Sequence, residues 1–233
     1  MRRVLLAILA FAILIPGSAL AIPEDYLGET LVFMTLRRGE IEPEYFFDIG
    51  RVGDEIVRRH SLGIEAGVTD HLMLDGRFTF DQTARDRGFD SGRFEVRYRF
   101  YEPGALPVDI AASAEVNSER GAAGDRRSYA VEPRLILSKQ LGRIDAALNV
   151  SGEIRLRGGG GSQLLSAAAL SYAPVGAVRF GSELQYAFRE KRASVIPQIW
   201  INLPHHLTVK AGYVRGSHRS DERFARVSLE IDF

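Results

Sequence analysis

The chain of 233 residues contains no cysteine, and this absence removes several classes of protein from consideration. Without cysteine there is no disulfide framework, no thiolate metal site and no lipid-modified N-terminal cysteine. An excess of charge of one sign is also lacking, because 30 lysine and arginine residues balance 30 aspartate and glutamate residues. Proteins that bind nucleic acids usually carry an excess of positive charge, which this chain lacks, so we expect no nucleic-acid partner.

Long hydrophobic runs are scarce as well. The run Val4 to Ile15 follows Arg2 and Arg3 and is too short for a membrane-spanning helix, which needs about 20 apolar residues. It is followed by Ala19-Leu20-Ala21, a small-residue cleavage signal. We therefore interpret residues 1–21 as a signal peptide cleaved after Ala21, in preference to a single transmembrane anchor. An export signal on a cysteine-free chain is typical of a bacterial envelope protein.

The most abundant pattern in the chain is the alternation of apolar and polar residues, seen most clearly from Leu62 to Gln82. Apolar residues occupy every second position from Leu62 to Val68 and again, with one glycine, from Leu72 to Phe80. Successive side chains on a strand point to opposite faces, so each segment has one apolar and one polar face. The polar residues 69–71 between them predict a turn. The stretch therefore reads as an antiparallel hairpin.

The same alternation recurs to the last residue and predicts about twelve strands of roughly 9–12 residues, the length of a tilted transmembrane strand. Short turns at 69–70, 103–106, 141–142, 174–176 and 204–206 alternate with longer polar loops, expected at 50–56, 83–92, 118–127, 156–162, 189–192 and 215–222. We predict an all-β fold, a single transmembrane antiparallel up-and-down β-barrel of about twelve strands over residues 39–233. A soluble lipocalin-like barrel, with fewer strands and its apolar face in a core, is the structural alternative.

Three features depart from the simple pattern. Residues 22–38 contain LVFMTL, which is apolar without clean alternation, and we expect a periplasmic N-terminal segment or a short extra strand. Trp200 falls on the inward face, away from the interfacial positions that Trp prefers. Pro133 and Pro197 lie inside predicted strands, where each removes a ladder donor, so we expect them to mark bulges or strand ends.

The leader, the alternating strands and the ending ARVSLEIDF together resemble Gram-negative outer-membrane β-barrel proteins. The resemblance implies residence in the bacterial cell outer membrane, contact with its lipid, and recognition of Phe233 by the barrel-assembly machinery. More narrowly, RRGEIEPEYFF followed by LGIEAGVTDHLMLDGRF is similar to outer-membrane transporters grouped with the phenol-degradation MetA-pathway family.

The inward face is densely charged and is the candidate site. Its predicted lumen-lining residues are Glu42, Glu44, Asp48, Glu65, Asp75, Arg77, Glu95, Arg97, Arg99, Glu132, Arg134, Glu153, Arg179, Glu183, Lys210, Arg226 and Glu230. Opposite charges on adjacent strands would form an ion-pair network that fills a narrow lumen. Alternatively, the charges line an aqueous channel and set its selectivity. Twelve strands lie between the filled eight-stranded and the open sixteen-stranded barrel, and we expect a narrow or plugged pore.

The function that follows is a channel or transporter that passes small solutes passively through the lumen. The alternative is a non-conducting envelope barrel with a structural or surface-binding role. We do not expect an enzyme, because His60 and Ser61 are adjacent on a strand, point to opposite faces and cannot form the dyad of a lipid hydrolase. The remaining histidines suggest no metal site, and we expect neither metal nor cofactor.

Overall fold

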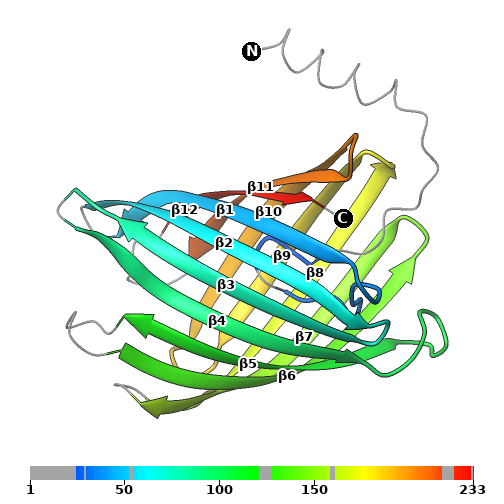
Figure 1. Ribbon diagram of the computed structural model, residues 1–233, viewed down its shortest axis with the longest axis horizontal. Coiled ribbons are helices and arrows are strands. Elements are labelled where there is room, and N and C mark those ends of the chain that lie inside the picture. The colour runs from blue at the N-terminus through cyan, green and yellow to red at the C-terminus, as the bar shows by residue number, and fades with distance from the viewer. Residues whose placement is uncertain are drawn as a thin grey trace, which may run out of the picture.

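The computed structural model describes residues 25–28, 30–52, 55–84, 86–120, 127–157, 161–216, 223–231 and 233, so the expected leader lies outside the described residues. Twelve antiparallel strands follow one another around a closed barrel, and the last pairs with the first (Figure 1). The strands are β1 (Ile41–Val52), β2 (Glu55–Thr69), β3 (Leu72–Gln82), β4 (Arg87–Arg99), β5 (Asp109–Arg120), β6 (Arg127–Leu141), β7 (Ile144–Arg157), β8 (Gln163–Val175), β9 (Val178–Ala187), β10 (Arg192–Leu203), β11 (Leu207–Gly216) and β12 (Arg223–Ile231). The predicted fold class and the strand number are confirmed.

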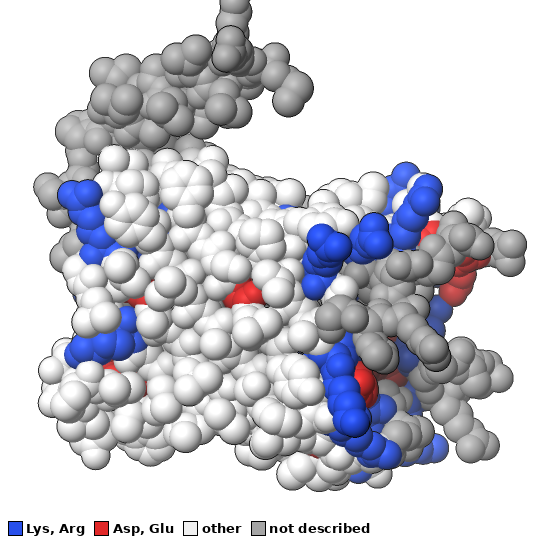
Figure 2. Space-filling view, turned by 180° about the vertical axis from the view of Figure 1, so that it is seen from behind, with Lys and Arg blue, Asp and Glu red and all other residues white. Residues whose placement is uncertain are grey.

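The two faces of the wall have the polarity of a barrel in lipid. Leu62 and Phe78 are each 56% exposed on the outside, whereas Glu95 and Glu183 are each 1% exposed. Figure 2 shows a broad belt almost free of charged side chains, with lysine, arginine, aspartate and glutamate gathered toward both ends. Closure pairs the backbone groups of every strand with those of its neighbours, as hydrocarbon requires. No helix in the described part of the chain is long and apolar enough to span a membrane.

The barrel is closed at the end of the chain. Ile41 and Phe233 exchange backbone hydrogen bonds, with N···O distances of 3.4 Å and 3.2 Å. Both residues lie at the end of the barrel that carries the short turns. The terminal phenylalanine therefore completes the seam between β1 and β12.

The short turns lie where the sequence predicts them, but the expected longer loops are too wide, most of all 50–56 and 83–92. Arg51 pairs with Ile56 within the predicted loop 50–56, and Arg87 pairs with Gln82 inside the predicted loop 83–92. The strands continue beyond the apolar belt, where both faces can be polar. Alternation is lost there although backbone pairing goes on, so the pattern placed the strand ends too early.

Pro133 and Pro197 mark neither strand ends nor changes of register, and that expectation is wrong. Pro133 pairs with Ala114 on one side, and pairing with β7 is interrupted between Val131 and Arg134 without a shift. Pro197 pairs with Ser182, and the ladder to β11 has the same gap. A proline lacks one N–H, so it loses the bridge to one neighbour only and the register is kept.

Candidate functional site: the barrel lumen

All the charged residues predicted to line the lumen lie on the inner face of the wall. Thirteen are buried: Glu44, Asp48, Glu65, Asp75, Arg77, Glu95, Arg97, Arg99, Glu132, Arg179, Glu183, Lys210 and Glu230. The other four, Glu42, Arg134, Glu153 and Arg226, are half-buried. Arg99 differs in position, since it donates to the Asp70 carbonyl oxygen at 2.6 Å and to Glu102 at 3.0 Å. It joins two short turns at one rim and stands apart from the rest of the lumen.

The charges form the expected network only in part. Arg226 lies directly opposite Asp48 across the seam and donates to both carboxylate oxygens, at 2.7 and 2.8 Å. On β1–β6, in contrast, one row of directly opposite residues carries the same charge throughout. This acidic row consists of Glu42, Glu65, Asp75, Glu95, Glu115 and Glu132, each facing the next across a strand boundary.

Like charges directly opposite one another are destabilising, so the acidic row needs compensation from elsewhere. The compensating arginines lie one step along the strands on either side of the row. Arg93 donates to Asp75 at 3.0 Å from the long-loop side, and Arg134 donates to Glu132 at 2.7 Å from the short-turn side. The ion pairs of the acidic row are therefore diagonal or run along a strand, whereas Arg59 and Asp81, nearer the long loops, pair directly across β2 and β3 at 3.1 Å.

The N-terminal segment, residues 25–38, lies inside the barrel as far as Leu36, and its last residues, Arg37 and Arg38, are exposed; Figure 1 shows it as the blue stretch before β1. Its described part contains no strand, and Leu27, Thr30 and Leu31 are 1%, 0% and 3% exposed. The two apolar clusters of the described interior both join this segment to the wall. They consist of Tyr26, Val32, Ala147, Ala169 and Trp200, and of Leu31, Phe33, Ala111 and Ile136.

Wall side chains satisfy the backbone of this segment. Glu183 accepts from the N–H groups of Gly28 and Thr30, at 2.5 and 3.0 Å. Asn149 accepts from the Leu31 N–H at 2.8 Å and donates to the Leu31 carbonyl at 2.9 Å. Gln198 and Ser138 accept from two further N–H groups of the segment. An irregular backbone inside a membrane barrel is tolerated where protein groups complete its hydrogen bonds, as they do here.

Cations predicted to line the lumen also hold the segment. Arg97 donates to both carboxylate oxygens of Asp25, at 3.1 and 2.6 Å. Arg226 donates to the Leu27 carbonyl at 3.0 Å, and Lys210 donates to the Asp25 carbonyl at 2.9 Å. These side chains face inward as predicted, but they contact the N-terminal segment as well as one another.

Tyr26 explains why Trp200 faces inward. The two rings meet edge to face with centroids 5.1 Å apart, and Trp200 is 2% exposed. The Tyr26 hydroxyl donates to the Asp145 carbonyl oxygen at 3.0 Å. Burial raises the pKa of the Tyr26 phenol to about 12, because the phenolate would lose its hydration.

Glycines make room where the segment meets the wall. A Cβ atom at Gly67 would overlap the carbonyl oxygen of Arg37, and one at Gly212 would stand 2.7 Å from the Leu27 side chain. The segment leaves the lumen beside Gly67, whose carbonyl accepts from the Gly39 N–H at 2.8 Å. Close approach of the two backbones therefore depends on the missing side chain.

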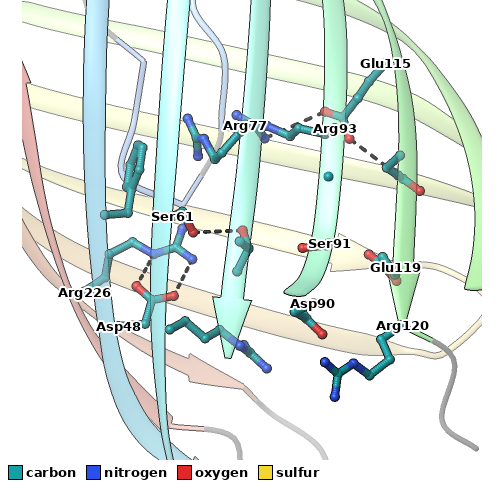
Figure 3. Close-up of a pocket in the computed structure, with 15 residues that line it drawn as sticks. Asp48, Ser61, Arg77, Asp90, Ser91, Arg93, Glu115, Glu119, Arg120 and Arg226 are labelled. Carbon is teal, nitrogen blue, oxygen red and sulfur yellow. Dashed lines mark hydrogen bonds and ion pairs between the residues drawn. The ribbon is translucent and has the colours of Figure 1, made fainter. Parts of the chain in front are cut away.

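Two cavities lie toward the long-loop end. The larger, of about 400 Å³, is lined by five arginines (Arg59, Arg77, Arg93, Arg120 and Arg226) and four acids (Asp48, Asp90, Glu115 and Glu119) (Figure 3). The Arg77 guanidinium lies over the Phe46 ring, 3.9 Å from its centroid. The second cavity, of about 250 Å³, lies against β6–β10 and is bordered by Gly28 of the N-terminal segment.

The predicted separation of His60 from Ser61 agrees with their contacts. Ser61 faces the lumen and its hydroxyl lies 2.8 Å from that of Thr79. His60 faces outward and its Nδ1 lies 2.7 Å from the Tyr45 hydroxyl. Neither contact brings a serine and a histidine together.

Sequence reasoning found the charged wall but missed its uncharged members and the occupant of the lumen. Ser138, Asn149 and Gln198 all lie on the inward face by alternation, yet nothing local distinguishes them from ordinary polar residues. Their partners lie more than 100 positions away in the chain. The available signal was the non-alternating apolar run 31–36, which cannot face both lipid and water as a strand.

Comparison with known proteins identifies the fold. No family model matches the chain, and no curated protein matches it. The KdgM porin superimposes with a TM-score of 0.64 at 12% identity, covering 82% of this chain and 99% of that chain. The COG4313 outer membrane channel from Pseudomonas putida F1 gives 0.61 at 10% identity, covering 86% and 98%. Outer membrane phospholipase A from Escherichia coli gives 0.51 at 10% identity, covering 91% and 98%. The chain thus has an outer-membrane barrel fold, and its narrower resemblance to the MetA-pathway family stays a prediction.

Proposed function

We propose that this protein is an outer-membrane channel that passes small solutes passively through its charged lumen, and that residues 25–38 close the lumen in the state described here. One observation carries the proposal. The inner wall is polar and charged at both ends, cavities extend inward from the long-loop end, and a single irregular segment occupies the remainder. The channel names of two solved neighbours support the same class of function.

The way in which the segment is held supports a removable closure. Among the described residues 25–36, the backbone hydrogen bonds run to wall side chains, to the Asp25 side chain or within the segment, and none joins the backbone of a strand. The segment is continuous with the wall only through Gly39 and Glu40. Withdrawal of the segment therefore leaves all twelve strand pairings intact. What it exposes is the polar wall that a solute needs.

A reversible disulfide cross-link between the N-terminal segment and the barrel wall tests the proposal. Because the chain has no cysteine, the pair Phe33→Cys and Ala111→Cys, from one apolar cluster, introduces the only two thiols. Refolded residues 22–233 are placed in a planar bilayer. We expect discrete conductance steps when the thiols are reduced and their disappearance on oxidation. The single variant Phe33→Cys is the control, and its conductance should not change on oxidation. A folded protein that is silent in both redox states contradicts the proposal.

The choice of solute follows from the outer cavity. Its volume of about 400 Å³ falls within the usual range for small-molecule sites, ~300–1,000 Å³. Five arginines line it, and one solved KdgM porin structure holds oligogalacturonate. Acidic sugars are accordingly the first solutes to test. A reversal potential that indicates anion preference would support an anionic solute, and a cation preference would redirect the search.

The alternative is a non-conducting envelope barrel, and the occupied lumen is the observation that favours it. In that case the N-terminal segment is a permanent core element. Its release should then lower stability as much as the loss of any other buried segment, without conductance at any applied voltage. The cysteine pair separates the two functions, because only the channel responds to reduction.

Export and assembly complete the proposal. The leader at residues 1–21 would direct the chain across the inner membrane, with cleavage after Ala21. Phe233 would be read by the barrel-assembly machinery, and residence in the bacterial outer membrane would follow. Removal of Phe233 should slow insertion into outer-membrane-derived vesicles, whereas replacement by tyrosine should not.

We propose no hydrolytic activity, since Ser61 faces the lumen and His60 faces outward.

A further inference from the structure

Glu65 occupies an unusual position in the acidic row. It faces Glu42 on one side and Asp75 on the other, and it is 9% exposed. Carboxylate oxygens of Glu44, Glu65 and Asp75 all lie within 4.8 Å of one another. Glu44 is bonded to Arg77 at 2.7 Å, and Asp75 to Arg93 at 3.0 Å. Within the described residues, Glu65 accepts no hydrogen bond and joins no ion pair.

A second observation points to a missing ligand. Asp75 is 2% exposed, and its Oδ1 atom is buried without a hydrogen-bond partner in the described structure. The Asp75 Oδ2 atom carries the contact with Arg93, so Oδ1 is the oxygen of this carboxylate without a partner. Buried carboxylate oxygens are normally hydrogen-bonded or bound to a cation, because removing them from water is otherwise costly. Two buried carboxylates of one cluster therefore offer oxygens that no protein group uses.

We propose that Glu44, Glu65 and Asp75 bind a hard divalent cation of the size of Ca²⁺. Carboxylate oxygens are the ligands that such ions take, at about 2.3–2.6 Å, so two ligands of one Ca²⁺ lie up to roughly 5 Å apart. The upper limit of 4.8 Å on the separations in this cluster falls within that span. Asp25 adds negative charge at Glu65, and Arg97 opposes it. The site goes beyond the proposed channel function and does not depend on conduction.

Binding is measured directly on the folded chain in detergent. Residues 22–233, stripped with a chelator, are titrated with CaCl₂ by isothermal titration calorimetry, and Tm is recorded with and without 5 mM CaCl₂. We expect one bound ion per chain, an upward shift of Tm, and a weaker response to MgCl₂. The variant Glu65→Gln should abolish both the heat and the Ca²⁺-dependent shift.

A matched control comes from the same acidic row. Glu132 is paired with Arg134 at 2.7 Å and lies four strands from Glu65, so Glu132→Gln should keep the Ca²⁺ response. Without Ca²⁺, Glu65→Gln should melt above the unaltered chain, because one repelling charge is gone. If Ca²⁺ leaves the Tm of the unaltered chain unchanged, or if Glu65→Gln responds as fully as Glu132→Gln, the proposal is overturned. A proton shared among the three carboxylates would then explain the cluster.

Discussion

Arg97 binds the Asp25 carboxylate through both terminal guanidinium nitrogens, and thereby ties the N-terminal segment to β4 inside the barrel. The Arg97 side chain is 3% exposed and is also bonded to Glu95 at 3.0 Å. Two acids, one from the segment and one from the wall, therefore share a single buried cation. Bidentate pairs between arginine and carboxylate are among the stronger polar contacts in proteins.

Replacement of Arg97 should be costly. Arg97→Met leaves Asp25 without its cation and Glu95 with Arg134 alone, and removing one partner of a buried ion pair typically costs about 3–5 kcal/mol. We expect a fall of that size in the free energy of unfolding, measured by urea titration of protein folded into vesicles. Arg120→Met, which breaks an exposed pair with Asp86, should cost less than about 1 kcal/mol. Equal losses in the two variants would contradict the role assigned to Arg97.

Gly67→Ala should displace the N-terminal segment. The added methyl group would overlap the carbonyl oxygen of Arg37, and both overlapping groups are held by backbone, so the segment has to move. We expect open probability in planar bilayers to rise at least about tenfold, which corresponds to ~1.4 kcal/mol. Gly76→Ala is the control, because a Cβ atom there meets nothing within 4 Å. Unchanged gating in Gly67→Ala would show that the segment does not control conduction.

Alkaline pH should loosen the segment through Tyr26. Its pKa is raised to about 12 in the folded state, whereas an unfolded tyrosine titrates near 10. The stabilisation is fully present below pH 10 and is lost as the pH rises from about 10 to 12. Unfolding midpoints of the unaltered chain should therefore fall more steeply across this window than those of Tyr26→Phe. Parallel curves for the two proteins would place the Tyr26 hydroxyl in contact with water.

The lipid-facing belt can be tested with a charge at two depths. Leu62 is 56% exposed at the middle of β2, and Leu141 is 62% exposed at the short-turn end of β6. An arginine at the midplane of a barrel costs about 2–4 kcal/mol, and one near the interface about 0–1. Leu62→Arg should therefore destabilise the protein in vesicles far more than Leu141→Arg does. The opposite order would show that the membrane midplane lies nearer to Leu141 than to Leu62.

The wall could be predicted from the sequence because its determinants are local. Leu62 and Glu65 are assigned to opposite faces by a period of two, and lipid on one side makes that period strict. Turn residues such as Asp70 and Gly142 separate the strands for equally local reasons. The strand ends near Arg51 and Arg87 were missed, since pairing outlasts the apolar belt and leaves no alternation to read.

The interior could not be predicted, because it depends on contacts between distant residues. Whether Glu95 faces Glu115 or an arginine is fixed by register, which turns and bulges set, and a shift of one residue changes every neighbour. Leu31 and Asn149 likewise meet only after the barrel has closed. The acidic row and the occupied lumen are for this reason properties of the assembled structure, although each residue involved was visible in the sequence.

The hydrogen bonds between Ile41 and Phe233 give the wall a cyclic topology. A covalent link between these two residues would leave all twelve pairings in place, and the polypeptide could instead begin within the long loop between β5 and β6. In such a circular permutant the first strand no longer carries residues 25–38. Residues 25–38, which fill the lumen, would become a separate ligand, and a synthetic peptide of this sequence could be added to the permutant as a pore blocker.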